Sequence, residues 1–221
     1  MAEKIKTVIF DMDGVIFDTE KLCLVSWEYA AEQYKLENIA DVFKRCIGTN
    51  HNMTRDIMFD TYGGEFPFED FRKKAAEYFF EYERKHGVPL KPKVHDTMKW
   101  LKRNDYRIGL ASSTAHATVE RELREAGLFE YFDVIICGDA VGRSKPAPDI
   151  YIEACRAIGE RTENCFAVED SINGIISALD AGLKTIMVPD MLPCDERVKG
   201  RLFALCDDLG DVCGILEKYN Y

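Results

Sequence analysis

Residues 11–19 read DMDGVIFDT and follow directly on the apolar run Thr7–Phe10. If the chain is still extended there, Asp11 and Asp13 project from the same face, ~7 Å apart. At an effective dielectric constant of 20, the repulsion between two carboxylates at that separation is ~2 kcal/mol. A strand that is apolar enough to be buried therefore ends in a charge repulsion that another group must offset.

Apolar runs rich in β-branched residues recur along the chain and predict the strands of one sheet. After the first run they occupy residues 108–111, 134–137, 165–168 and 185–188. From the second run onward, helix-like stretches separate them and end at Gly127, Gly159 and Gly182; glycine just past a helix is a common stop signal. Continuously apolar strands that alternate with helices indicate an α/β fold with a parallel sheet covered on both faces.

The interval from about Asp18 to His86 breaks this alternation, because it is helix-like throughout and mixes aromatic with charged residues. The segment GVPLKP at residues 87–92 then has the composition of a linker. We therefore predict a core formed by residues 1–17 and 88–221, with a helical module of residues 18–87 inserted after the first strand.

The composition limits the class of partner. The chain has 221 residues and a net charge of −10, which argues against binding to a nucleic-acid backbone. No apolar run approaches the ~18 residues of a membrane span, and the N-terminus lacks the apolar region of a signal peptide. The eight cysteines form no C-x-x-C pair and indicate buried, reduced thiols. We expect a cytoplasmic protein and, by default, a monomer.

Polar residues follow the predicted strands at the point where each strand ends. Ser112–Thr114 follow the second strand, Lys145 lies in SKPAPD after the third, and Glu169 and Asp170 follow the fourth. In an open parallel sheet the carboxyl ends share one edge, and ligands bind in the crevice there. Acidic oxygens suit Mg²⁺, whereas a hydroxyl group and a lysine suit a phosphate. With the metal neutralising their charge, an aspartate can attack phosphorus and form an acyl phosphate.

Four segments of the chain, in order, resemble the four motifs of the haloacid dehalogenase superfamily: DMDGVIFDT, Ser112, SKPAPD, and VEDSINGI at residues 168–175. The likeness covers nearly the whole chain and is nearest to the phosphatase and β-phosphoglucomutase branch. It implies a Rossmann-like, doubly wound core with a small helical cap, which corresponds to the inserted module. Because Asp13 is present, the founding dehalogenase chemistry is excluded, since that branch lacks this second acid.

The resemblance also implies roles for single residues in the chemistry. Asp11 would be the nucleophile that becomes phosphorylated. Asp13 would act as general acid toward the leaving oxygen and then as general base for the incoming water. Ser112, Ser113 and Lys145 would hold the phosphoryl group during transfer.

The Mg²⁺ site implied by the resemblance draws on both acidic segments. Asp11 and Asp170 would bind the ion directly. Glu169 would be either a further ligand or an acid that supports one. Asp13 would give the metal its backbone carbonyl, which leaves its carboxylate free for proton transfer.

Within this branch, the resemblance attributes substrate choice to the cap. The mutases carry a histidine in the first cap helix and a Gly-x-Ser-Arg-x-x-Ser stretch that grips the sugar phosphate. Here Cys23 occupies the first position, and residues 48–54 read GTNHNMT with His51 in place of the arginine. Losing a guanidinium removes bidentate recognition of phosphate, so we favour a phosphatase for a small phosphorylated metabolite, such as a sugar phosphate. The cap residues expected near the substrate are Gly48, Thr49, His51 and Arg55.

A mutase, a switch and a binding protein stay open from the sequence as other functions. The binding protein would carry a degenerate active site, although no core residue is missing here. A mutase of the β-phosphoglucomutase type shares the core residues. A non-enzymatic switch of the receiver type also places aspartates, a hydroxyl residue and a lysine around Mg²⁺, although the inserted module and the motif order disfavour it. Turnover separates an enzyme from a switch, because a switch accepts one phosphoryl group whereas an enzyme releases phosphate continuously.

Overall fold

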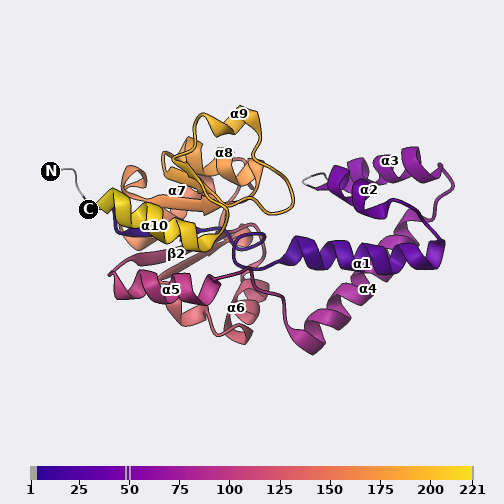
Figure 1. Cartoon of the computed structure of the whole chain (residues 1–221), viewed down its shortest axis with the longest axis horizontal. Helices are drawn as coiled ribbons and strands as arrows, with labels where there is room; N and C mark the ends of the chain where they lie inside the picture. Colours follow the sequence, from indigo (N-terminus) through magenta and orange to yellow (C-terminus); the bar gives the residue numbers. More distant parts are fainter. Residues whose placement is uncertain (1–3, 48, 50, 221) are drawn as a thin grey trace. The chain divides into compact units, whose positions relative to one another are not determined.

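The computed structural model describes residues 4–47, 49 and 51–220, and the chain divides into two compact units (Figure 1). The larger unit consists of Met1–Asp18 and Leu90–Tyr221, and the smaller one of Thr19–Pro89. The chain therefore passes between the units twice. In the larger unit, Phe17 and Leu90 form an antiparallel bridge next to these two crossings.

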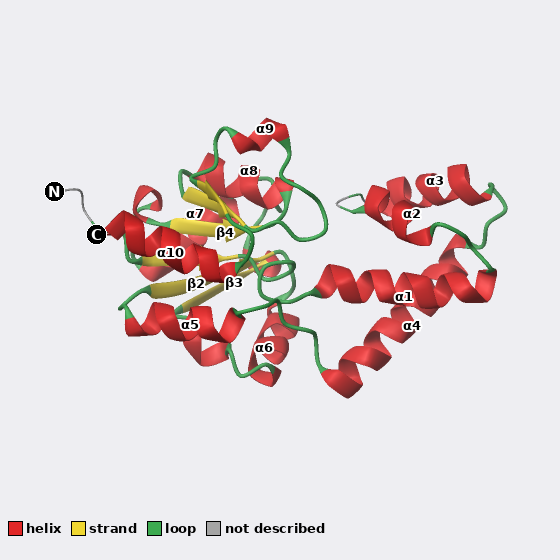
Figure 2. Ribbon diagram, viewed as in Figure 1, coloured by secondary structure: helices red, strands yellow, loops and turns green. Residues whose placement is uncertain are grey.

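Over the residues described, the larger unit contains a parallel sheet of 6 strands in the order β3-β2-β1-β4-β5-β6 (Figure 2). The strands are β1 (Thr7–Phe10), β2 (Arg107–Ser112), β3 (Val134–Cys137), β4 (Phe166–Glu169), β5 (Lys184–Met187) and β6 (Ala204–Leu205). β1 pairs with β2 on one side and with β4 on the other. The predicted parallel sheet is confirmed, and the short edge strand β6 is an addition to the prediction.

The central strands are buried on both faces, which explains their continuously apolar sequences. Every residue of β1 and β4 is buried. Space between the central strands and their neighbours is so limited that a Cβ at Gly109 in β2 would lie 2.5 Å from Cδ1 of Ile9. A side chain at this position would therefore have to displace the side chain of Ile9 in β1.

Helices cover both faces of this sheet. They are α5 (Val94–Arg103), α6 (His116–Glu125), α7 (Asp149–Ile158), α8 (Ile172–Ala181), α9 (Glu196–Lys199) and α10 (Leu209–Asn220), with 3₁₀ turns at Phe129–Tyr131, Gly138–Ala140 and Thr162–Asn164. α5 packs with α10 on one face, and α7 packs with α8 on the other (Figure 1). The predicted helix ends are confirmed, because Gly127, Gly159 and Gly182 have φ angles of 66°, 77° and 93°, which favour glycine.

The smaller unit is built from the helices α1 (Thr19–Tyr34), α2 (Ile39–Cys46), α3 (His51–Tyr62) and α4 (Phe68–His86). The ring of Trp27 lies edge-on to Phe43 and Phe71, with centroid distances of 5.2 and 5.3 Å. Such pairs add ~1 kcal/mol each beyond burial of their surface. An open pocket of about 350 Å³ in this unit is lined by Cys23 as well as by Trp27 and Phe43.

Two observations apply to the chain as a whole. All eight cysteines carry free thiols, and those at positions 46, 137, 155, 165 and 206 are buried. No helix among the described residues combines the length and the apolar character needed to cross a membrane.

Candidate active site

The candidate site lies at the carboxyl edge of the sheet, where β1 ends between β2 and β4. Ligands of doubly wound sheets bind where the strand order reverses, and this is such a point. Asp11 follows β1 directly, and its amide donates a hydrogen bond to the carbonyl of Val168 in β4 at 2.9 Å. The residue is only 7% exposed. An acidic side chain is thereby fixed and largely removed from water at the centre of the sheet.

Lys145, in the segment after β3, contacts this acid with its side chain. Its Nζ donates to Oδ1 of Asp11 at 2.5 Å, to Oε1 of Glu169 at 2.7 Å, and to the carbonyl of Ala111 at 3.0 Å. The side chain is 8% exposed. The ammonium group therefore lies between two acids that come from β1 and β4, and its three donors all have acceptors.

Glu169, the last residue of β4, is fully buried, and both of its carboxylate oxygens accept hydrogen bonds. Besides Lys145, Oε1 accepts from the hydroxyl of Tyr151 at 2.7 Å. Oε2 accepts from the amide of Asp170 at 3.2 Å and from the hydroxyl of Ser171 at 3.2 Å. A Cβ at Gly174 would overlap this carboxylate, so glycine in the first turn of α8 leaves the space that it occupies.

Burial and the neighbouring charges shift the pKa values of Asp11 and Lys145. Burial raises the pKa of Asp11 to about 7, against the opposing effect of Lys145 and with further increases from Glu169 and Asp13. Burial acts to lower the pKa of Lys145, but the carboxylates of Asp11 and Glu169 outweigh it and raise that pKa. The lysine is therefore a permanent cation, and it leaves an excess of negative charge at the site.

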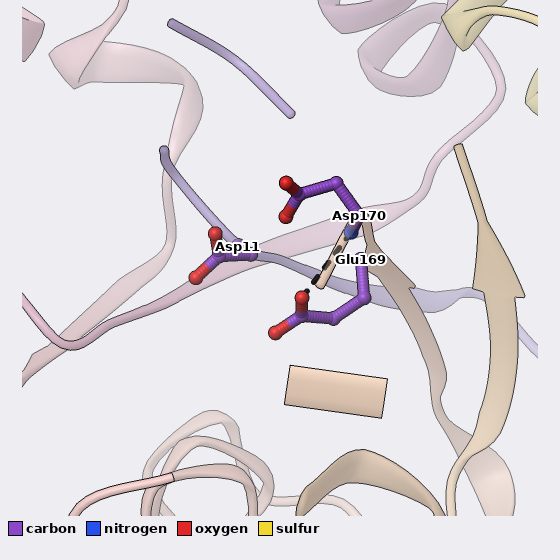
Figure 3. Close-up of side chains that lie close together, drawn as sticks. All are labelled: Asp11, Glu169 and Asp170. Atoms are coloured by element: carbon purple, nitrogen blue, oxygen red, sulfur yellow. Dashed lines mark hydrogen bonds between the residues drawn. The ribbon is translucent and has the colours of Figure 1, made fainter. Parts of the chain in front are cut away.

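Three acidic side chains lie close enough to share a cation. One ligand oxygen from each of Asp11, Glu169 and Asp170 lies within 4.8 Å of the others (Figure 3). A Cβ at Gly14 would overlap the carboxylate of Asp170, so the glycine of DMDG makes room for this acid. Carboxylate oxygens are the hard ligands that Mg²⁺ takes. The residues present therefore fit a divalent cation, although both oxygens of Glu169 already accept hydrogen bonds from the protein.

Asp13 and Ser112 meet at one residue of the loop after β2. The hydroxyl of Thr114 donates to Oδ2 of Asp13 at 3.0 Å, and its amide donates to Oγ of Ser112 at 3.1 Å. The loop that carries Asp13 is closed by a bond from the Gly14 amide to the carbonyl of Phe17 at 2.8 Å. The carboxylate of Asp13 thus faces the end of β2 and lies outside the cluster of three acids.

Ser113, which the sequence predicts to bind the phosphoryl group, is exposed on this same loop. A Cβ at Gly138 would overlap its carbonyl, so the glycine after β3 allows the two segments to approach. The loop after β2 is therefore held closely against the end of β3.

The predicted cap residues belong to the smaller unit. Gly48 lies outside the described residues. The hydroxyl of Thr49 donates to the carbonyl of Cys46 at 2.7 Å and lies 2.8 Å from the hydroxyl of Thr54. Both of these contacts of the Thr49 hydroxyl are therefore with residues of the smaller unit itself.

His51 and Arg55 lie on the first two turns of α3. Nδ1 of His51 accepts a hydrogen bond from Arg72 at 2.5 Å, which places the ring hydrogen on Nε2, 3.1 Å from a carboxylate oxygen of Glu69. Arg55 contacts Asp56 at 3.2 Å. Both side chains therefore have ionic or polar partners within the smaller unit.

Three residues that the sequence pattern does not single out complete the site: Thr114, Tyr151 and Gly174. Thr114 stands in a polar run after a strand. The run as a whole indicates a site, but nothing in the sequence distinguishes this residue within it. Tyr151 has the spacing of an ordinary core residue of α7. Gly174 offers one usable signal, because glycine within a helix costs ~1 kcal/mol relative to alanine and calls for a packing reason.

Comparisons with known proteins agree with this geometry. A family model described as haloacid dehalogenase-like hydrolase matches residues 8–188. The phosphorylated carbohydrates phosphatase of Thermotoga maritima is 32% identical over 183 residues, which are 82% of this chain and 83% of that protein. Pyrophosphatase PpaX of Bacillus cereus is 28% identical and covers 98% of this chain and 99% of its own. A crystal structure of CbbY from Rhodobacter sphaeroides in complex with xylulose-(1,5)bisphosphate is 26% identical, has a TM-score of 0.68, and covers 94% of this chain and 96% of that one.

These matches span most of the sequence, and they agree with the convergence of four separate segments on one sheet edge. The predicted fold class and the predicted enzyme class, a phosphoric monoester hydrolase, are confirmed. The chain belongs to the haloacid dehalogenase-like hydrolase family.

Proposed function

We propose that this protein is a Mg²⁺-dependent phosphatase that hydrolyses a small phosphorylated metabolite, in the first place a sugar phosphate, through a phosphoaspartyl intermediate. The observation that carries the proposal is the contact of Lys145 Nζ with Oδ1 of Asp11 at 2.5 Å, beside the carboxylates of Glu169 and Asp170. It supports the proposal because the candidate nucleophile, a cation suited to phosphate and the candidate metal-binding acids lie together.

In this proposal Asp11, Asp170 and the backbone carbonyl of Asp13 hold the Mg²⁺ ion, while Glu169 acts on Lys145. When bound, the ion would neutralise the carboxylates and withdraw charge from the phosphoryl oxygens. Lys145 supplies a further positive charge for the same phosphoryl group. Its contacts with both acids keep the ammonium group in position before substrate arrives.

The chemistry would proceed in two displacements at phosphorus. A carboxylate oxygen of Asp11 attacks phosphorus, the ester P–O bond breaks, and Asp13 gives a proton to the leaving alcohol. A water molecule then attacks the same phosphorus, passes a proton to Asp13, and releases phosphate together with the free Asp11 carboxylate. Ser112, Ser113 and Lys145 hold the phosphoryl oxygens through both steps.

We further propose that the smaller unit, Thr19–Pro89, acts as a cap, the role that the sequence analysis predicts for residues 18–87, with hinges near residues 16–17 and 88–89. Its insertion directly after the Asp11–Asp13 segment supports this role, and closure would exclude bulk water from the site. Its proposed substrate contacts are Gly48, Thr49, His51 and Arg55. His51 offers an imidazole where the mutases have a guanidinium, which favours hydrolysis over mutase activity.

Support for the substrate class comes from the named relatives. The Thermotoga maritima protein is a phosphatase of phosphorylated carbohydrates, and CbbY binds a sugar bisphosphate. The Bacillus cereus protein is a pyrophosphatase, so similar cores serve substrates of different shape. We also propose a cytoplasmic monomer, a compartment supported by the eight free thiols.

The test is a phosphate-release screen across sugar phosphates, phosphoglycolate, pyrophosphate and nucleotides, with Mg²⁺ and with a chelator. We expect release of phosphate from a sugar phosphate in Mg²⁺ alone, and none from the Asp11→Asn variant. Asp96→Asn, an exposed position on α5, is the matched control and should keep full activity. Turnover in chelator would contradict the metal requirement. Conversion of β-glucose 1-phosphate to glucose 6-phosphate without release of phosphate would make the protein a mutase instead.

A further inference from the structure

We infer that Thr114 is a positioning residue that orients both the acid–base residue Asp13 and the phosphate-binding residue Ser112. The inference rests on the proposed phosphatase function and adds to it a residue that none of the four motifs contains. Its basis is the pair of hydrogen bonds that Thr114 makes, one from its hydroxyl to Asp13 and one from its amide to Ser112.

The hydroxyl of Thr114 is not used as a helix cap, although threonine before a helix commonly caps it. α6 begins at His116, and its N-cap position is Ala115, which makes no side-chain capping bond. Instead the hydroxyl crosses to Asp13, 101 positions earlier in the chain, at 3.0 Å. A local helix-capping role therefore does not account for this side chain.

Thr114 is itself held in place by Gly138, which directly follows the neighbouring strand β3. Its carbonyl accepts a hydrogen bond from the amide of Gly138 at 3.1 Å. The close approach of Gly138 to Ser113, where a Cβ would overlap the Ser113 carbonyl, keeps the two segments together. The Thr114 hydroxyl that donates to Asp13 thus lies on a loop that is held by its contacts with Gly138.

The contact determines which oxygen of Asp13 handles the proton. Oδ2 accepts the Thr114 hydroxyl, so Oδ1 is the oxygen left to give a proton to the leaving alcohol and to take one from water. A carboxylate without this bond could rotate and present either oxygen. A displacement of about 1 Å in a reacting group can reduce the rate ~10²-fold, and general acid–base catalysis contributes ~10²- to 10⁴-fold in all.

The second hydrogen bond orients the hydroxyl group of Ser112. Its Oγ accepts the amide of Thr114 at 3.1 Å, and this directs the hydroxyl hydrogen away from the amide, free to donate to a phosphoryl oxygen. Because this bond comes from the main chain, substitution of the Thr114 side chain should leave it in place. The side-chain contribution can therefore be measured separately, at Asp13.

The test compares two classes of substrate in Thr114→Val and Thr114→Ser. The ratio kcat/KM reports the steps up to formation of the phosphoaspartate, in which Asp13 protonates the leaving group. An alkyl phosphate, such as the sugar phosphate that the wild type hydrolyses, needs this proton, whereas p-nitrophenyl phosphate loses a stable phenolate without it. Thr114→Val should lower kcat/KM for the alkyl phosphate ~10- to 100-fold and for p-nitrophenyl phosphate less than ~3-fold.

Three controls make the outcome specific. Thr114→Ser keeps a hydroxyl and should restore kcat/KM for the alkyl phosphate to within ~3-fold of wild type. In an Asp13→Asn background, Thr114→Val should change kcat/KM less than ~3-fold, because the residue that it positions is already removed. Thr162→Val, in the 3₁₀ turn before β4 at the opposite edge of the sheet, should behave as wild type. If Thr114→Val does not fold, Thr114→Ala carries the same comparison.

The inference is overturned if kcat/KM falls equally for both substrates, if it does not fall, or if serine fails to rescue it. The proposed function is decided separately, by phosphate release from wild type and its loss in Asp11→Asn. Wild type without turnover of either substrate would therefore reject the phosphatase and the inference with it. Turnover by wild type without the substrate-selective loss would reject the role of Thr114 alone.

Discussion

Replacing Asp11, the proposed nucleophile, by asparagine should make the metal-free protein more stable, and the gain should grow with pH. Burial raises the pKa of Asp11 from 3.8 to about 7. The folded protein therefore keeps this proton up to about pH 7, whereas the unfolded chain releases it near pH 4. Between these values the folded state binds more protons, so stability falls as pH rises. The contribution is fully present below pH 4 and is lost as pH passes through 7.

The size of this effect follows from the same two values. They differ by about three pH units, and at ~1.4 kcal/mol for each the ionised carboxylate costs ~4 kcal/mol above pH 7. Asparagine keeps the shape and an acceptor for Lys145 but carries no charge, and Glu169 still neutralises the lysine. We expect Asp11→Asn to match wild type near pH 4 and to exceed it by ~2 to 4 kcal/mol at pH 8, or ~4 to 16 °C in Tm for a chain of this size.

The assay is thermal and urea unfolding of both proteins at pH 5, 6, 7 and 8 in the presence of a chelator. Asp96→Asn on the exposed first turn of α5 removes the same formal charge and should change stability by ~0.5 kcal/mol at most. Added Mg²⁺ should stabilise wild type more than Asp11→Asn, because only wild type keeps all of the proposed carboxylate ligands. A variant that is less stable than wild type at pH 8, or a difference that is constant from pH 5 to 8, would refute the reasoning.

Three further substitutions test the packing around the site and the attachment of the C-terminus. Gly174→Ala should abolish most activity and lower the free energy of unfolding by ~1 to 3 kcal/mol, because its Cβ would overlap Glu169. Gly142→Ala meets no atom within 4 Å and serves as the control; equal behaviour of the two variants would contradict this account. Tyr151→Phe should lower the free energy of unfolding in urea by ~1.5 to 3 kcal/mol, since it removes a buried hydrogen bond to a carboxylate; an unchanged midpoint would argue that this bond contributes nothing. Asn220→Ala should cost ~2 to 4 kcal/mol in urea at unchanged kcat/KM, because its amide bonds to the main chain just before β1; a loss of activity without loss of stability would be the contrary result.

The sequence predicts the central strands well and the last part of the chain poorly, for a physical reason. The buried strands need continuously apolar residues, and that requirement is visible in the sequence. β6 has only two residues, Ala204–Leu205, and is partly exposed, so no apolar run announces it. α10 contains Gly210 and Gly214, each unfavourable in a helix by ~1 kcal/mol. Its packing against α5 decides its conformation, and such a contact is absent from the local sequence.

At the candidate site, too, the sequence predicts some contacts and leaves others undetermined. The order of strands and polar segments predicts that Lys145 and Asp11 meet, although they stand 134 positions apart. The sequence leaves the role of Glu169 open, because a buried carboxylate takes its function from its partners. These include Tyr151 on α7, and the packing of α7 against the sheet, not the motif, brings its hydroxyl to that acid.

Two glycines illustrate why the local sequence is ambiguous at this site. Asp13-Gly14 has the composition of a tight turn, and Gly14 indeed has a φ of 80°. Its second requirement comes from Asp170, whose carboxylate occupies the space of the missing Cβ. Gly174 lies in regular helix, where no φ demands glycine, and the carboxylate of Glu169 is its only evident reason. Both acidic segments therefore keep a glycine where a side chain would displace a carboxylate, so substitutions at these positions should disturb the candidate site before they disturb the sheet.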